Sequence, residues 1–192
     1  MDLIQNQREL QKEAHEVLAK LNLLNILSIY GKPEIVGSLS TGLMTWRDID
    51  IELVGEIDED KYWKVVKEIF HTPEYKRTIV IDFRKSNNPN TPKGLHICIT
   101  DYDFKNDGNL WKVDIWFLDR KPGEPNFNDW IKDKITPANK IVLLSLKKEV
   151  KMSPTYGKEI FSVDIYKAVI ENGVRDLEGF KKYLSNQGRS LD

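Results

Sequence analysis

Two aspartates lie two positions apart in a segment that alternates acidic and aliphatic residues. Asp48 and Asp50 are separated by Ile49, and Glu52 extends the acidic series. Alternate residues of a β-strand point to the same face of a sheet, so both carboxylates would leave the strand on one side. Adjacent carboxylates repel each other, and a cation between them would relieve that repulsion. Hard oxygen ligands of this kind suit Mg²⁺ or Mn²⁺.

A third carboxylate, that of Asp114, stands alone in a later strand-like segment, residues 110–118. Phosphoryl chemistry uses bound metal ions to neutralise phosphate charge and to hold the attacking and leaving oxygens in line. Two carboxylates can hold one ion, and a second ion that activates an acceptor hydroxyl needs a carboxylate from a neighbouring strand. We therefore predict Asp48, Asp50 and Asp114 as the catalytic and metal-binding residues.

The sequence around these acids resembles the signature of the polymerase-beta-type nucleotidyltransferases. That signature has a hydrophobic residue, Gly, and Gly or Ser, followed at some distance by an acid-hydrophobic-acid-hydrophobic strand. Here Val36–Ser38 is followed, after nine residues, by Asp48–Ile51, and Val113–Ile115 matches the third acid. The resemblance covers the first two-thirds of the chain. Chain size and a helical tail resemble, more narrowly, the small bacterial aminoglycoside- and lincosamide-type nucleotidyltransferases.

The resemblance implies a reaction and a role for each matched residue. A nucleoside monophosphate would move from an NTP co-substrate to an acceptor hydroxyl, with release of pyrophosphate. Gly37 would let the backbone approach the phosphates, and Ser38 would hydrogen-bond the triphosphate. Asp48 and Asp50 would ligate Mg²⁺, while Asp114 would hold a second ion or act as general base.

Other side chains are weaker candidates for the site. Arg47 directly precedes the acidic strand and could contact phosphate, and Lys158 could reach the triphosphate from the helical part; an ordinary surface role is open for both. The predicted nucleotide-binding set is thus Gly37, Ser38, Arg47 and Lys158. The three histidines show no metal-binding spacing, and His96 with Cys98 is too small a set for zinc, so structural roles suffice for them.

Hydrophobic periodicity predicts the elements that must position these residues. We expect strands at residues 34–36, 48–54, 78–83, 95–99 and 110–118, and helices at residues 4–24, 58–70, 137–150, 159–170 and 176–184. The turn signal at residues 106–109 predicts an antiparallel hairpin. The predicted fold class is α/β (α+β): a small mixed sheet of the nucleotidyltransferase fold with flanking helices. A catalytic domain would span residues 1–121, and a C-terminal helical region residues 122–192.

Composition and charge limit the kinds of partner and the cellular location that we expect for this protein. The 192 residues carry a net charge of −1, which would not attract a polyanion over a long distance. We therefore expect an NTP and an unidentified acceptor, most simply a small molecule, with no extended nucleic acid and no membrane. The one cysteine excludes an intrachain disulfide, and the first 20 residues lack an export signal, so a cytoplasmic location is expected. The sequence does not indicate an oligomeric state.

Two other functions stay open on the sequence alone. The chain could be a non-catalytic nucleotide-binding or antitoxin-like regulatory member of the same superfamily, for which a missing acid would be the mark. All three acids are present, which favours an enzyme. A metal-dependent phosphohydrolase could use the same acids on water.

Overall fold

The computed structural model describes residues 2–72, 75–88, 91–119 and 127–191. Contacts divide the chain into two compact units, one of Glu9–Asn126 and one of Met1–Arg8 with Phe127–Asp192. The predicted domain boundary after residue 121 falls outside the described residues and stays a prediction.

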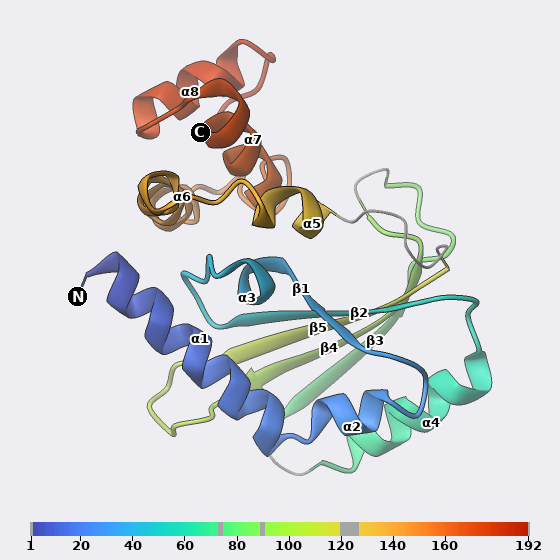
Figure 1. The fold of residues 1–192 in the computed structure, drawn as a ribbon. Helices are drawn as coiled ribbons and strands as arrows, with labels where there is room; N and C mark the ends of the chain where they lie inside the picture. The colour runs from blue at the N-terminus through green and yellow to red at the C-terminus, as the bar shows by residue number, and fades with distance from the viewer. Residues whose placement is uncertain (1, 73–74, 89–90, 120–126, 192) are drawn as a thin grey trace. The chain divides into compact units, whose positions relative to one another are not determined.

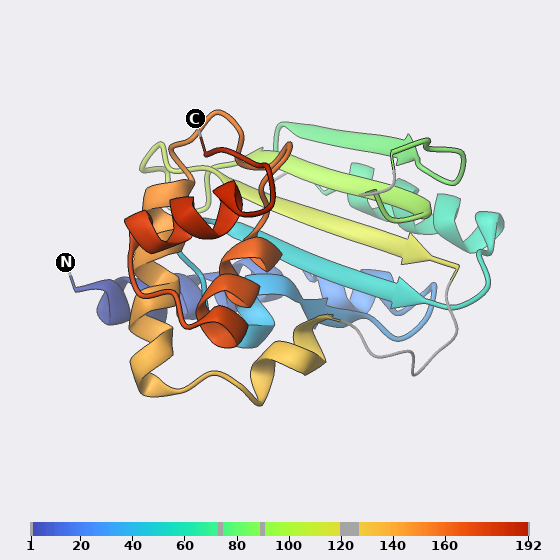
Figure 2. The same ribbon diagram turned by 90° about the horizontal axis from the view of Figure 1, so that it is seen from above.

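The larger unit is built on a five-stranded mixed sheet (Figures 1 and 2). The strands, in their order across the sheet, are β1 (Glu34–Val36), β2 (Asp48–Val54), β5 (Trp111–Leu118), β4 (Gly94–Tyr102) and β3 (Arg77–Asp82). Strands β2 and β5 are parallel, and the other neighbouring pairs are antiparallel. All five strands and the β4–β5 hairpin were predicted from the sequence. The predicted fold class, a small mixed sheet with flanking helices, is confirmed.

One face of the sheet forms the hydrophobic core of this unit. Figure 1 shows α2 (Leu23–Leu27) and α4 (Glu59–Phe70) on one side of the sheet, and α1 (Leu3–Lys20) contributes its residues from Leu10 onward to the same core. The strands supply alternate aliphatic and aromatic side chains: Ile49, Ile51, Leu53, Leu95, Ile97, Ile99, Val113, Ile115 and Phe117. Because strand side chains alternate between faces, the aspartates of β2 and β5 must lie on the opposite face.

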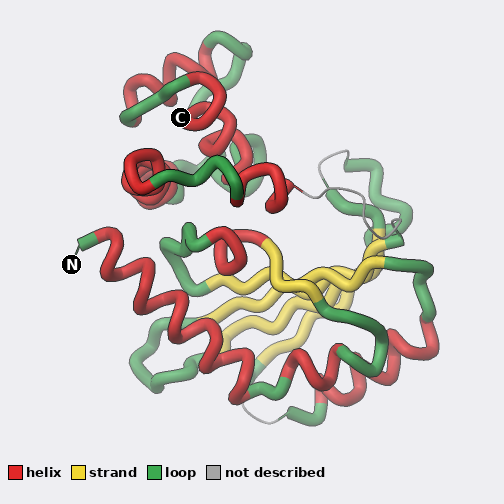
Figure 3. Tube along the Cα trace, in the orientation of Figure 1, coloured by secondary structure: helices red, strands yellow, loops and turns green. Residues whose placement is uncertain are grey.

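The smaller unit is helical in its described part (Figure 3). It contains α5 (Phe127–Lys132), α6 (Pro137–Val150), α7 (Ser162–Asn172) and α8 (Leu177–Ser185). Helix α6 matches its predicted range because Thr136 and Asn139 form a capping box and Pro137 occupies the first turn. Helix α5 was not predicted. None of the helices in the described ranges is both long and apolar enough to cross a membrane.

Candidate metal and nucleotide site

The pairing of β2 with β5 brings the three predicted acids together. Asp50 and Asp114 are register partners on these parallel strands, and Asp48 lies two residues before Asp50 on the same face. One carboxylate oxygen from each of the three residues lies within 4.8 Å of the other two. Asp48 and Asp50 are half-buried and Asp114 is buried. This group of carboxylates can hold a metal ion, and the catalytic roles of its members stay predictions.

Gly37 lies against the carboxylate of Asp50. Val36, the last residue of β1, is the register partner of Asp50, and Gly37 follows it with a φ of 63°. A Cβ atom at this position would lie 2.2 Å from Asp50 Oδ2. Only a residue without a side chain fits there, because a larger one would clash and would also favour a different backbone conformation.

The chain after Gly37 forms a short helix that was not among the predicted elements. Helix α3 spans Gly37–Thr41 and ends at Gly42, whose φ is 69°. The hydroxyls of Ser40 and Thr41 donate hydrogen bonds to the carbonyl oxygen of Gly37, at 3.1 and 3.0 Å. These local bonds hold the turn in a helical form, as serine and threonine do when they bond to preceding carbonyls. The triphosphate-binding role of Gly37 and Ser38 stays a prediction.

Asp114 is held by two neighbours on its own face of the sheet. The Nε2 of His96 lies 3.0 Å from Asp114 Oδ1, and Lys112 forms an ion pair with Asp114 Oδ2. Burial raises the pKa of Asp114, but the hydrogen bond from His96 and the charge of Lys112 outweigh it and leave the pKa below its ordinary value. Asp114 is therefore ionised at neutral pH, in the form that can bind a cation or accept a proton.

His96 and Lys112 belong to this site but were not predicted from the sequence to do so. Cys98 is the register partner of Asp114, so His96 is a diagonal neighbour on the same face. Its ring packs against those of Trp116 and Phe83, with centroid distances of 4.3 and 5.8 Å. The strand at residues 95–99 was predicted from the sequence, but its register against β5 was not.

The two cations predicted to bind the nucleotide, Arg47 and Lys158, differ in their surroundings in the structure. Arg47 Nε donates to Glu13 Oε1 at 2.6 Å, so the guanidinium is tied to α1. A phosphate contact by Arg47 would compete with this ion pair. Lys158 belongs to the helical unit, where it lies exposed in the turn between Tyr156 and Ile160. The nucleotide contacts of both residues stay predictions.

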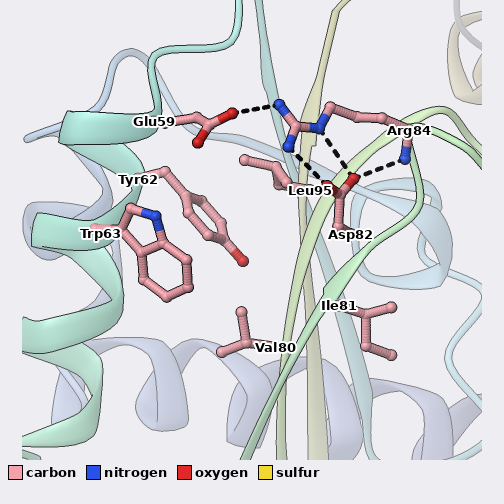
Figure 4. Close-up of a pocket in the computed structure, with 8 residues that line it drawn as sticks. All are labelled: Glu59, Tyr62, Trp63, Val80, Ile81, Asp82, Arg84 and Leu95. Atoms are coloured by element: carbon pink, nitrogen blue, oxygen red, sulfur yellow. Dashed lines mark hydrogen bonds and ion pairs between the residues drawn. The ribbon is translucent and has the colours of Figure 1, made fainter.

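A pocket of about 220 Å³ lies between α4 and β3, apart from the aspartates (Figure 4). Its lining includes Tyr62, Val80 and Leu95, and Arg84 lies at its edge, bonded to Asp82 and Glu59. Val80 and Leu95 pair with core residues of the neighbouring strands. The pocket is therefore on the core side of the sheet and is not part of the acidic site.

No family model matches the sequence, and no curated protein matches it. Solved structures of Cid1 poly(U) polymerase and of a cytoplasmic RNA terminal U-transferase are similar in fold. A mutant of Cid1 bound to MgATP has a TM-score of 0.59 and 17% identity, over 90% of this chain and 53% of that one. Cid1 in complex with its short product ApU gives 0.54 and 18%, over 88% and 53%. The U-transferase gives 0.53 and 17%, over 87% and 53%. The chain thus spans about half the length of these proteins.

These similarities contradict the expectation of a small-molecule acceptor without extended nucleic acid. The matched proteins are a poly(U) polymerase and an RNA terminal U-transferase, and one structure holds the short product ApU. The expectation was wrong because a net charge of −1 limits only long-range attraction and does not restrict a site that receives the end of a strand. Chain size and helical content likewise say nothing of the acceptor. The similarities establish that the chain has a nucleotidyltransferase fold, the fold of the Cid1 structures.

Proposed function

We propose that this protein transfers a nucleoside monophosphate from an NTP to the 3′-hydroxyl of an RNA strand, in the presence of Mg²⁺ or Mn²⁺. The proposal depends on one observation. Asp48, Asp50 and Asp114 lie on one face of the sheet, with one carboxylate oxygen of each within 4.8 Å of the other two. The fold supports it, since the matched structures have bound nucleotides. An RNA acceptor and a cytoplasmic location, where NTPs and RNA are both present, are part of the proposal.

The three carboxylates fit a divalent cation by their chemistry. All three offer hard oxygen ligands, and Asp114 is ionised at neutral pH, which is the form that binds a cation. Bound at Asp48, Asp50 and Asp114, Mg²⁺ would neutralise charge on the phosphates of the NTP. The turn at Gly37 and Ser38 lies beside Asp50, where its backbone would approach the triphosphate.

The proposed reaction is an in-line displacement at the α-phosphorus. The 3′-hydroxyl oxygen of the acceptor forms a bond to the α-phosphorus, and the bond from that phosphorus to the leaving pyrophosphate breaks. The hydroxyl proton leaves to a base, and Asp114 would be that base or one of the residues that would hold the second ion. His96 and Lys112 keep Asp114 in place and ionised for both roles.

An extension assay tests the proposal. Labelled single-stranded RNA is incubated with the protein, Mg²⁺ and each NTP in turn, and products are separated on a denaturing gel. We expect stepwise extension with pyrophosphate release, and loss of at least about a thousandfold in D50N and D114N. D101N is the matched control, because Asp101 belongs to an acidic pair of the same spacing in the hairpin, outside the site; its backbone φ of 61° suits asparagine.

The rival functions give different results in the same experiment. Binding of NTP by calorimetry without transfer to RNA would indicate a non-catalytic nucleotide-binding or antitoxin-like protein. Release of phosphate or nucleotide without any acceptor would indicate a phosphohydrolase. The narrower resemblance to aminoglycoside- and lincosamide-type enzymes stays a prediction, and modification of those antibiotics in place of RNA would overturn the proposed acceptor.

A further inference from the structure

We infer that Trp116 and Phe83 form an aromatic platform that stacks against the base of the 3′-terminal nucleotide of the acceptor RNA. This inference rests on the proposed function, because it assigns a position to the acceptor of that reaction. The two side chains are half-buried, and His96 lies buried between them and Asp114.

The order of the strands decides on which side the acceptor enters. The Gly37–Ser38 turn follows β1, at one side of β2, whereas β5, β4 and β3 succeed one another on the other side. In-line displacement requires the attacking oxygen and the leaving pyrophosphate on opposite sides of the α-phosphorus. A triphosphate held at the turn after β1 therefore places the acceptor over β5 and β4. Trp116 and Phe83 lie on that side.

The rings form a stack that begins next to Asp114. Trp116 is two residues beyond Asp114 on β5, so the two side chains share a face and are separated by roughly 7 Å along the strand. The centroid distances are 4.3 Å between His96 and Trp116 and 5.3 Å between Phe83 and Trp116, with interplanar angles of 32° and 30°. Rings at these distances and small tilts overlap face to face as a slipped stack, and a flat base can extend such a stack.

The charges around the platform favour a base there and the phosphates further out. Glu52, on β2, is the register partner of Trp116, and its carboxylate would repel a phosphate but not a neutral base. The segment that follows Phe83, residues 84–93, carries Lys85 and Lys93 and no acidic residue. Its third cation, Arg84, is already bound by Asp82 and Glu59. Lys85 and Lys93 are exposed. A single strand with its terminal base on the platform would direct its preceding phosphates toward these cations.

A binding experiment tests the platform without requiring turnover. Fluorescence anisotropy measures the affinity of the 192-residue D50N protein for labelled single-stranded RNA that ends in a normal or an abasic 3′ nucleotide. A stacked base contributes about 1–3 kcal/mol, so the normal RNA should bind about 5- to 150-fold more tightly. Adding W116A should abolish this preference, and W116F should keep most of it. W63A is the matched control, since Trp63 is 56% exposed on α4, away from the platform.

The outcomes test the platform and the proposed function independently of each other. Equal binding of the two RNAs, or an unchanged preference in W116A, would overturn the platform even where RNA is extended. If the preference for the normal 3′ nucleotide depends on Trp116 but the protein extends no RNA, the platform is supported and the proposed transfer is contradicted. In the transfer assay, W116A should raise the KM for RNA at least fivefold and leave the KM for NTP unchanged. F83L, expected to weaken the preference in part, provides the test if W116A does not fold.

Discussion

His96 acts on the proposed chemistry through a single hydrogen bond. The carboxylate of Asp114 can only accept, so His96 Nε2 carries the proton and donates it at 3.0 Å. Among the described residues, Nδ1 of the same ring is buried and has no hydrogen-bond partner. A buried polar atom left in this state costs about 1–3 kcal/mol, so stability alone does not favour an imidazole here. The hydrogen bond that orients Asp114 gives a physical reason for a histidine at this position.

Replacing His96 should therefore weaken metal binding more than it weakens the fold. We expect H96L to lose about 10- to 100-fold in Mn²⁺ affinity, as is typical when a residue that orients a metal ligand is removed. H96Q should stay within a few-fold of wild type, because its amide can still donate to Asp114. Titration with Mn²⁺ followed by electron paramagnetic resonance measures the affinity, and thermal unfolding serves as control. Equal affinity in H96L and wild type would show that the hydrogen bond is only structural.

Gly37 can be compared with a second glycine that shares its backbone conformation but not its neighbour. Gly37 and Gly108 have φ values of 63° and 77°, and only Gly37 has atoms near the position of a Cβ. G108A should lose about 1–2 kcal/mol of unfolding free energy from the backbone alone. G37A should lose more and should also displace the Asp50 carboxylate, with loss of metal binding. Urea unfolding and Mn²⁺ titration measure the two effects, and identical behaviour of both variants would contradict the close approach to Asp50.

At the scale of elements, a buried carboxylate ties α1 to three parts of the larger unit. Glu13 is 4% exposed and accepts hydrogen bonds from Arg47, Lys105 and Trp111. Arg47 directly precedes β2, Lys105 lies in the β4–β5 hairpin, and Trp111 is the first residue of β5. Glu13 thereby fixes the starts of the two strands that carry the aspartates. The sequence did not reveal it, because one acid on an amphipathic helix resembles any solvated residue.

The pKa of Glu13 predicts how stability depends on pH. Burial raises this pKa, but the hydrogen bonds from Arg47, Lys105 and Trp111 lower it from 4.5 to about 2. A lowered pKa stabilises the folded state fully above pH 4.5, and this contribution disappears as the pH falls toward 2. The shift corresponds to about 3 kcal/mol.

E13Q should thus be less stable than wild type at pH 7, by up to about 3 kcal/mol, with the difference vanishing near pH 2. Urea unfolding at a series of pH values measures it. E16Q is the control on the same helix, because Glu16 is exposed and its ion pair with Lys12 contributes little. A constant difference between E13Q and wild type across this pH range would show that ionisation of Glu13 is not what stabilises the fold.

The elements show which features of the fold a sequence can predict. Strand β2 was predicted because the acid–aliphatic alternation of residues 48–54 has a period of two, and α6 because Pro137 and its cap mark a start. The helix predicted over residues 4–24 is in fact interrupted after Lys20, since Asn22 adopts a φ of 51°. The contact of His96 with Asp114 depends on a β4–β5 register that contains an irregularity between Ile99 and Tyr102. Such long-range pairing is set by tertiary packing, which local patterns do not encode.

At the scale of the whole molecule, the balance of charge determines how RNA would be bound. The chain has 29 basic and 30 acidic residues, so no overall field attracts a polyanion. Recognition of a strand must then depend on a few local contacts, namely a stacked base and the cations of residues 84–93. This agrees with a protein that receives the end of a strand and differs from one that coats its length.

The salt dependence of RNA binding measures the number of those contacts. Each phosphate neutralised on a single strand contributes about −0.7 to the slope of log affinity against log salt concentration. The two exposed lysines, Lys85 and Lys93, predict a slope of about −1.4, and K85Q and K93Q should each reduce its magnitude by about 0.7. K61Q is the control, since Lys61 is an exposed cation on α4. Anisotropy titrations between about 50 and 300 mM KCl provide the values. A slope of about −5 or steeper would require more phosphate contacts than Lys85 and Lys93 provide, and would show that the acceptor is bound elsewhere along its length.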